Sequence, residues 1–591
     1  MTQITLLPSQ VSHVDKLTHI LTFNPFALDL SSLGSGKTYT SCFIAQREPE
    51  KYKNIIVIAP VSVKVKWIQM QKDYNIPLTN AISYCELRSI KCKQPKHGLL
   101  HRRDYTVQQQ NPRGAGMINV DKCDFTVSDK FKKMVEEGVL IVIDEIQNVK
   151  NVNSQFHACQ ALIKHIVSHF TPESKSRVIL LSGSPIDKTE QAIHMFRSLH
   201  IMKHERLSHY DFREHAVVWD GMQDIVDYAN SVNSMAMQKL IEEWGGLRRL
   251  MRIRDTYMTR FCYNIFQDVI KPVISSAMLP PEHTFTINKC NGFYHIVDDT
   301  EAQLLIDAVY NLGKATRFEN NRINGTLGLQ SLRSISAAML QIETAKIGTF
   351  VRITCDALLN NPNQKVALCV NYTSTIQDLV KYLDMFDPLV LDGTVSVQKR
   401  AHVLRLFQAS NTNHRLIIGN IHVMSTGIDL DDKNGRFPRV AFVSPNYNTI
   451  NLYQLGFRFL RADTKSASTI HYIYGAHARE HKILSVLASK SRVMKETTPE
   501  QAAHGVVFPN DHESFHETPP EDFTQRQVFD ISTTRARRLY LQEIRIRERD
   551  AILNASDTES DESTIDADES AVDETEEADE SAVDETSEDE L

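Results

Sequence analysis

Cysteine, long apolar runs and an N-terminal export signal are scarce or missing in this sequence. The nine cysteines among 591 residues are scattered without a Cys-X-X-Cys pair, which indicates free thiols in a reducing compartment. No run approaches the roughly 18 apolar residues that a membrane-spanning helix needs. The first residues lack a charged segment followed by an apolar one, so we expect no signal peptide. These absences exclude a disulfide scaffold and a membrane-embedded chain.

Basic residues are absent from the C-terminal end. Residues 557–591 contain 18 Asp and Glu residues and no Lys or Arg, whereas the whole chain has 66 basic and 73 acidic residues. Residues 1–556 therefore contain 66 basic and 55 acidic residues, a net charge of +11. The tail is too acidic and too poor in apolar residues to bury a core, so we expect it to be disordered. The net positive charge of residues 1–556 indicates a polyanionic partner. The acidic tail could compete with that partner for the basic residues.

Short apolar runs alternate with amphipathic stretches in two parts of the chain, which predicts an α/β fold. The runs typical of buried parallel strands are NIIVIAP (54–60), GVLIVIDE (138–145) and RVILLSG (177–183), then KVALCVN (365–371), RLIIGN (415–420), RVAFVSP (439–445) and STIHYIY (468–474). We predict five parts: lobe 1 (1–200), a helical insertion (201–345), lobe 2 (346–495), a basic extension (496–556) and the disordered acidic tail (557–591). Within lobe 1, the polar residues 85–128 predict a surface insertion.

A glycine-rich segment, LGSGKT (33–38), follows the apolar stretch NPFALDL and precedes a helical pattern. The order of strand, glycine turn and helix is typical of a phosphate-binding loop. Backbone N–H groups at Gly34, Ser35 and Gly36 could bind phosphate oxygens. Lys37 could reach the β and γ phosphates, and the Thr38 hydroxyl could bind Mg²⁺. The alternative is a glycine turn without a ligand.

Two carboxylates end a second apolar run, IVIDEIQ (141–147). Carboxylates at the end of a buried strand are costly unless a cation lies nearby. Asp144 could orient Mg²⁺ and Glu145 could polarise an attacking water. A solvated acidic turn is the alternative. Both motifs in this order predict an ATPase that uses ATP and Mg²⁺.

A third candidate set lies in QLGFRFLR (454–461). Gln454, Arg458 and Arg461 are spaced at i, i+4 and i+7, which predicts one face of a helix. Two arginines there could place planar donors against the γ phosphate from the second lobe. A solvated basic helix is the alternative.

These motifs and several others resemble superfamily 2 helicases, and specifically the Swi/Snf-type ATPases, over most of residues 5–490. The further similar segments are LPSQ (7–10), IAPVSVKVKWIQM (58–70), DEIQNVKN (144–151), SGSP (182–185), MTRFCYNIFQDV (258–269), LPPEH (279–283), LDGTVSVQKRAHVLRLFQ (391–408) and STGIDL (425–430). The sequence departs from the family pattern at three positions. Ser31 stands where an acidic residue is usual, and Gln147 replaces a His. The family glycine directly before the arginine is shifted here, so that Gly456 lies two residues before Arg458. These departures bear on coupling more than on hydrolysis.

The resemblance implies two RecA-like lobes that bind ATP between them, with Gln10 reading the adenine. It implies nucleic acid, mainly double-stranded DNA, as the partner, contacted by Ser62, Lys64, Thr394, Ser425 and Thr426. The plan is nearest to the viral members of the family, of the nucleoside triphosphate phosphohydrolase I kind, which serve in transcription. That likeness implies transcription or virion proteins as partners and a place in the nucleus, the cytoplasm or a virion.

Two other functions remain open at the level of sequence. One is a strand-separating helicase acting on RNA or DNA. The other is a degenerate ATPase that serves as a scaffold, although Lys37, Asp144, Glu145, Arg458 and Arg461 are all present.

Overall fold

The first α/β unit is built on a six-stranded, wholly parallel sheet. The computed structural model describes residues 4–498 except 75, 77, 89–96, 111–116, 214, 247–254, 279–284, 286, 295, 297, 321–328, 412, 462 and 476–479. The strand order is β10-β1-β7-β6-β2-β3. Its strands are β1 (Phe26–Asp29), β2 (Asn54–Ala59), β3 (Leu78–Ser83), β6 (Val139–Asp144), β7 (Arg177–Leu181) and β10 (Ser275–Ser276).

Both faces of this sheet are buried, as the continuous apolar runs predict. Successive residues of β6 alternate between two cores: Ile141 and Ile143 pack on one face, and Leu140 and Val142 on the other. The helices and the 3₁₀ turn are α1 (Pro8–Phe23), α2 (Lys37–Arg47), α3 (Val61–Tyr74), α4 (Tyr84–Arg88), α5 (Asp129–Glu137), η1 (Ile146–Val149), α6 (Ser154–Ser168) and α7 (Gln191–Ser198). Because parallel strands end on one edge, the loops after β1 and β6 lie close together there.

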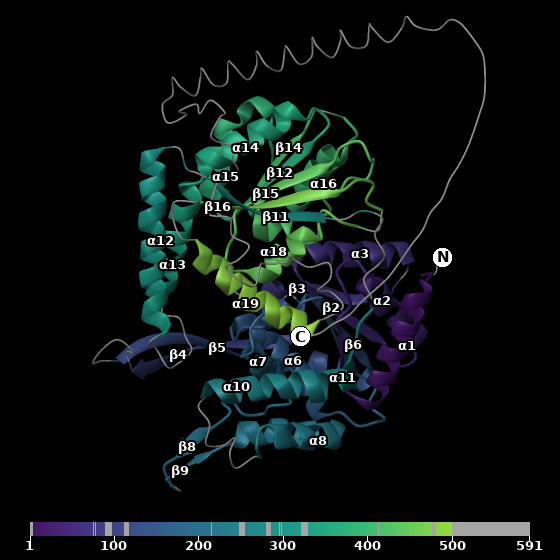
Figure 1. Ribbon diagram of the computed structural model, residues 1–591. Coiled ribbons are helices and arrows are strands. Elements are labelled where there is room, and N and C mark those ends of the chain that lie inside the picture. The colour runs from purple at the N-terminus through teal and green to yellow at the C-terminus, as the bar shows by residue number, and fades with distance from the viewer. Residues whose placement is uncertain are drawn as a thin grey trace, which may run out of the picture. The chain divides into compact units, whose positions relative to one another are not determined.

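The polar insertion of the first unit is an antiparallel hairpin of β4 (Leu100–Gln110) and β5 (Met117–Val127). It extends away from the parallel sheet (Figure 1). Most of its described side chains are exposed or half-buried, which agrees with the predicted surface insertion. The hairpin is not evident from the sequence, because its strands are polar and carry few apolar residues.

The second α/β unit contains another six-stranded parallel sheet, in the order β11-β16-β15-β12-β14-β13. Its strands are β11 (Ile287–Tyr294), β12 (Lys365–Val370), β13 (Leu389–Leu391), β14 (Leu416–Asn420), β15 (Arg439–Val443) and β16 (Ser468–Gly475). Its helices and 3₁₀ turn are α14 (Ile347–Asn360), α15 (Thr373–Tyr382), η3 (Asp384–Phe386), α16 (Val397–Gln408), α17 (Ile421–Met424), α18 (Thr449–Gly456) and α19 (His481–Thr497). The predicted α/β class with two RecA-like lobes is confirmed.

The described part of the stretch between the sheets is mostly helical but contains four strands. Its elements are β8 (His209–Asp211), β9 (Ala216–Val218), α8 (Asp220–Glu243), α10 (Asp255–Asn264), a π-helix (Ile265–Ile270), α11 (Lys271–Ile274), β10, β11, α12 (Asp299–Asn320) and α13 (Leu329–Thr344). β10 joins the first sheet and β11 joins the second, so residues 201–345 are not helical throughout. The sequence INKCNGFY of β11 is polar at several positions, as an edge strand can be, and it gave no apolar run.

The predicted helix over residues 454–461 is wrong in its second half. α18 ends at Gly456, and the N–H groups of Arg458 and Phe459 bond to carbonyl oxygens three residues earlier, in a turn. Glycine has low helix propensity, which favours an end at this position. The predicted basic extension (496–556) lies outside the described residues from residue 499 on, as do the acidic tail and LPPEH (279–283).

Among the residues that the structure describes, no helix is long and apolar enough to cross a bilayer.

Candidate nucleotide site

The glycine-rich loop connects β1 to α2 in a conformation that requires glycine. Gly34 (φ 82°) and Gly36 (φ 94°) both have left-handed backbones, and Gly36 caps the N-terminus of α2. A Cβ atom on Gly36 would lie 2.3 Å from Nε2 of Gln10, which is too close for any real contact. The loop therefore leads directly into a helix N-terminus, where N–H groups and the helix dipole favour an anion.

Lys37 lies in the first turn of α2 and points back into the loop. Its ammonium donates to the carbonyl oxygens of Ser31 and Ser32, both at 2.9 Å. Thr38 follows in the same turn and is half-buried. The positive charge is thus held within the loop that would receive the phosphates.

Gln10 contacts the loop from α1. Its Oε1 accepts the N–H of Leu7 at 2.9 Å, and its Nε2 donates to the carbonyl oxygen of Ser35 at 3.0 Å. The predicted adenine-reading residue is therefore adjacent to the candidate phosphate loop.

Asp144 is the last residue of β6 and is buried. Burial and the neighbouring Glu145 charge raise its pKa to about 7, although a hydrogen bond from Trp67 and the charge of Lys37 oppose the shift. The Trp67 indole Nε1 donates to Asp144 Oδ2 at 2.9 Å. Trp67 thus has a polar contact with the acidic motif that the spacing of the two segments does not predict.

Glu145 joins the acidic motif to two other segments. Its backbone is left-handed (φ 60°, ψ 56°), which is uncommon for a residue with a Cβ atom. Its Oε2 accepts hydrogen bonds from Gln147 Nε2 and, at 2.9 Å, from Gln454 Nε2. Ser182 of the SGSP segment donates to Gln147 Oε1 at 2.7 Å. Gln147 therefore bridges Glu145 and the SGSP loop.

Arg458 and Arg461 lie beyond the end of α18, close to the same site. The Arg458 Nε donates to the carbonyl oxygen of Ser425 at 2.7 Å, and its guanidinium is buried. Burial and the charge of Arg461 lower the Arg458 pKa to about 9, while Glu145 and Asp429 act in the opposite direction. Arg461 is next to the phosphate loop, since a Cβ atom on Gly34 would lie 3.8 Å from its Nη1.

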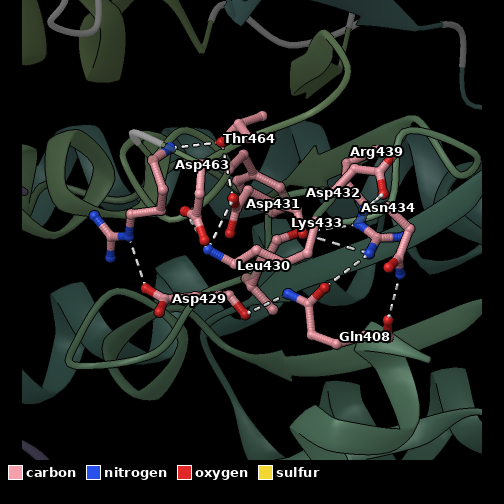
Figure 2. Close-up of polar contacts among 12 residues, drawn as sticks. Gln408, Asp429, Leu430, Asp431, Asp432, Lys433, Asn434, Arg439, Asp463 and Thr464 are labelled. Atoms are coloured by element: carbon pink, nitrogen blue, oxygen red, sulfur yellow. Dashed lines mark hydrogen bonds and ion pairs between the residues drawn. The ribbon is translucent and has the colours of Figure 1, made fainter. Parts of the chain in front are cut away.

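Two charged residues of this site were not identified from the sequence. Asp429 accepts a hydrogen bond from the Arg461 Nε at 2.7 Å (Figure 2). Burial alone would raise the Asp429 pKa, but Arg461 and Lys66 outweigh it and hold the pKa at about 2. Lys66 of α3 has a lowered pKa, through desolvation and the nearby charges of Arg458 and Arg461, while Asp429 opposes the shift. Asp429 lies inside STGIDL, so its position in a motif was the available signal.

The candidate nucleic-acid residues lie in three places. Ser62 is near the loop at Gly427, because a Cβ atom added to Gly427 would be 3.1 Å from the Ser62 Oγ. In the same loop, the Thr426 hydroxyl donates to the carbonyl oxygen of His422 at 3.1 Å. Lys64 pairs with Glu86 at 2.8 Å, and the Thr394 hydroxyl bonds to Asp392 at 2.6 Å. Ser425 differs from the prediction: it is fully buried, and its carbonyl supports Arg458 instead of facing a ligand.

Three comparisons with known proteins bear on this arrangement. Residues 349–463 match the family described as Helicase conserved C-terminal domain. A protein of Acanthamoeba polyphaga mimivirus, named as a candidate ATP-dependent RNA helicase, is 22% identical over 469 residues, covering 79% of this chain and 78% of that protein.

Two solved structures also match, both SWI2/SNF2 ATPase cores of Sulfolobus solfataricus. The core in complex with dsDNA is 14% identical, with 84% of this chain and 94% of that chain covered and a TM-score of 0.26. The core domain alone is 15% identical, with 82% and 89% covered and a TM-score of 0.27. At these TM-scores the likeness carries no argument about geometry.

Three findings agree. Residues 349–463 match a helicase domain, a viral relative is similar over most of the chain, and the ATPase motifs meet around one loop. The chain is an ATP-hydrolysing, helicase-like enzyme with a helicase C-terminal domain at residues 349–463.

Proposed function

We propose that this ATPase is stimulated by double-stranded DNA and uses ATP turnover to translocate along it. The observation that carries the proposal is the hydrogen bond between Gln454 Nε2 and Glu145 Oε2 at 2.9 Å, which joins the second parallel-sheet unit to the acidic motif of the first. The proximity of Arg461 to Gly34 supports the same view. Hydrolysis then depends on how the two units meet, as a translocating enzyme requires.

In the proposed mechanism each charged group has a separate role. Glu145 orients and polarises the attacking water, and Gln454 and Gln147 fix the position of its carboxylate. Lys37 and Arg461 stabilise the negative charge that develops on the transferred phosphoryl group. A change in the contact between the units would move Gln454 and Arg461 together, because Gln454 lies in α18 and Arg461 follows it closely in the chain. Nucleic acid that alters this contact would therefore alter the rate of hydrolysis.

Asp144 and Thr38 are the residues that would hold Mg²⁺. Within the described ranges, no three His, Cys, Asp or Glu side chains form a metal site by themselves, so phosphate oxygens and water would complete the coordination. The chemistry of Asp144 fits a cation, because its carboxylate is buried and its charged form is disfavoured without one. Bound Mg²⁺ would neutralise charge on the β and γ phosphates.

Backbone phosphates are the proposed contact points on the nucleic acid. Ser62 and Thr426 lie near each other at a junction of the two units, and Lys64 is on the same helix as Ser62. Thr394 supplies a separate, exposed position. Such contacts bind without reading bases, and the net charge of +11 outside the tail favours them.

A second candidate function is an RNA-dependent helicase, which the name of the mimivirus relative favours. Because that relative is viral, we also propose a role in viral transcription or genome handling, with transcription or virion proteins as partners. We place that role in the nucleus or cytoplasm of the host, or in a virion.

The test is ATP turnover measured without nucleic acid and with duplex DNA, single-stranded DNA or RNA at matched nucleotide concentration. We expect the largest stimulation with duplex DNA and no turnover in the Lys37→Ala variant under any condition. Stimulation by RNA alone would favour the second candidate. Turnover that no nucleic acid changes would contradict both, and normal hydrolysis by Lys37→Ala would overturn the assigned site.

A further inference from the structure

A buried histidine and a buried aspartate meet directly behind the phosphate loop. Asp29 is the last residue of β1 and is fully buried, and His13 of α1 is 3% exposed. The His13 Nε2 lies 3.1 Å from Asp29 Oδ2. A buried carboxylate next to an imidazole is costly to maintain in a core, and none of the proposed hydrolysis steps uses it.

Both residues of this pair are bonded to the start of the loop. The N–H of Ser31 donates to Asp29 Oδ1 at 3.0 Å, and the Ser31 hydroxyl lies 3.4 Å from His13 Nε2. The same hydroxyl accepts the N–H of Met278 at 2.9 Å. The other ring nitrogen of His13 is 2.9 Å from the Ser276 hydroxyl in β10. The pair thus joins α1, β1, β10 and the loop at one buried point.

The contacts continue from this pair to the lysine that would bind phosphate. Ser31 offers its N–H to Asp29 and its carbonyl oxygen to the Lys37 ammonium, at 2.9 Å. Burial alone would raise the Asp29 pKa, but the adjacent His13 and the charge of Lys37 outweigh it and lower the pKa. Asp29 therefore carries its negative charge behind a loop whose function needs a fixed shape.

The adenine side of the site depends on the same pair. Gln10 and His13 are three residues apart on α1, so they lie on one face of that helix. Gln10 bonds to the loop at Ser35, and His13 bonds to the strand that precedes it. A displacement of α1 relative to β1 would disturb both contacts together.

We propose that His13 and Asp29 are positioning residues of the nucleotide site, which fix the loop and α1 so that Lys37 and Gln10 are held for ATP. This inference rests on the assignment of the loop at 33–38 as the ATP site. Neither residue touches the nucleotide. Their effect passes through the backbone of Ser31 and through the position of α1.

The experiment compares Asp29→Ala with Asp29→Asn in the full chain. Alanine removes the acceptor for the Ser31 N–H, so we expect the KM for ATP to rise about tenfold, with kcat changed less. Asparagine can accept from Ser31 and donate to His13 Nε2, so we expect its KM to stay within about twofold of the parent value. His13→Ala leaves β1 unaltered and is expected to raise KM as Asp29→Ala does, which gives a second arm should Asp29→Ala fail to fold.

A matched control removes a different buried ion pair. Glu480 lies 3.2 Å from Lys346, and both are as buried as the His13–Asp29 pair but lie in the second unit. We expect Glu480→Ala to lower the unfolding temperature and to leave KM unchanged. The proposal is overturned if Asp29→Ala and His13→Ala act like Glu480→Ala, with lower stability and an unaltered KM. Failure of the ATP-site assignment would appear separately, as normal turnover in Lys37→Ala.

Discussion

At the scale of single residues, the site depends on backbone conformations that few side chains allow. Gly34 and Gly36 have positive φ in the loop, and Glu145 has positive φ although it is not glycine. The strain at Glu145 places its carboxylate where Gln147 and Gln454 both reach it. These positions explain why a short loop and one strand end can supply most of the site's chemistry.

The Gly36→Ala variant tests this local geometry. The new Cβ atom would lie 2.3 Å from Gln10 Nε2, and alanine at φ 94° is strained in addition. We expect ATP turnover to fall at least 100-fold and nucleotide binding to weaken, as measured by steady-state hydrolysis and by titration with a fluorescent ATP analogue.

Gly246→Ala is the matched control for backbone strain alone. Gly246 has φ 91°, but a Cβ atom there would meet nothing within 4 Å. We expect a loss of about 1 kcal/mol in stability and turnover close to that of the parent. Equal activity in the two variants would show that the loop tolerates a side chain and that its assigned geometry is wrong.

At the scale of elements, the sequence was informative where a strand is buried on both faces. The seven apolar runs all form strands of the parallel sheets, because a fully buried strand needs an uninterrupted apolar sequence. β11, β4 and β5 have no such run, and β10 has only two residues, so periodicity could not reveal them. The i, i+4, i+7 spacing predicts a helix through residue 461, but α18 ends at Gly456 because glycine has low helix propensity.

In the site, likewise, some residues belong to motifs that the sequence shows and others do not. Gln10, Lys37, Asp144, Glu145, Gln454 and Arg461 each belong to a recognisable motif, and the contacts described above join them around one loop. Asp429 lies inside the motif STGIDL, but its contact with Arg461 is tertiary. Lys66 and the His13–Asp29 pair likewise depend on contacts between segments far apart in sequence, so spacing did not reveal these contacts. The buried position of Ser425 is likewise set by packing in the second unit.

Lys365 gives a test of the second sheet that depends on pH. It is fully buried at the start of β12, and its ammonium donates to the carbonyl oxygens of Phe407 (2.9 Å) and Ala409 (2.6 Å). Burial and the charge of Arg439 lower its pKa to about 8, despite the opposing charge of Asp432. Between this value and the ordinary lysine pKa, the unfolded chain binds a proton that the folded chain does not.

The free energy of unfolding should therefore rise as pH increases from about 8 to about 10, relative to a Lys365→Met variant, which lacks this titration. We expect a gain of about 2 kcal/mol, read from urea unfolding of both proteins at pH 7.5, 8.5 and 9.5. Parallel pH profiles for the two proteins would contradict a lowered Lys365 pKa.

At the scale of the whole molecule, charge is divided unequally along the chain. Residues 557–591 carry 18 acidic and no basic residues, and residues 1–556 have a net charge of +11. An acidic segment attached to a mildly basic enzyme can compete with a phosphate backbone for the same surface. This division offers a function for the acidic residues 557–591.

Deletion of residues 557–591 should tighten binding to duplex DNA at low salt, since it changes the net charge from −7 to +11. We expect a gain of about tenfold near 50 mM salt that diminishes as salt rises, measured by fluorescence anisotropy over a salt series. An unchanged affinity across that series would remove the competition hypothesis.

The central claim for the whole molecule is that hydrolysis requires groups from both parallel-sheet units. Arg461 follows α18 of the second unit and lies beside Gly34 of the first. The most direct measurement is ATP turnover and ATP affinity of Arg461→Ala, compared with the parent enzyme at saturating duplex DNA. We predict that kcat falls at least 100-fold while the Kd for ATP changes only a few-fold, because the guanidinium acts on the transition state. Unchanged turnover in a folded Arg461→Ala protein would contradict the account.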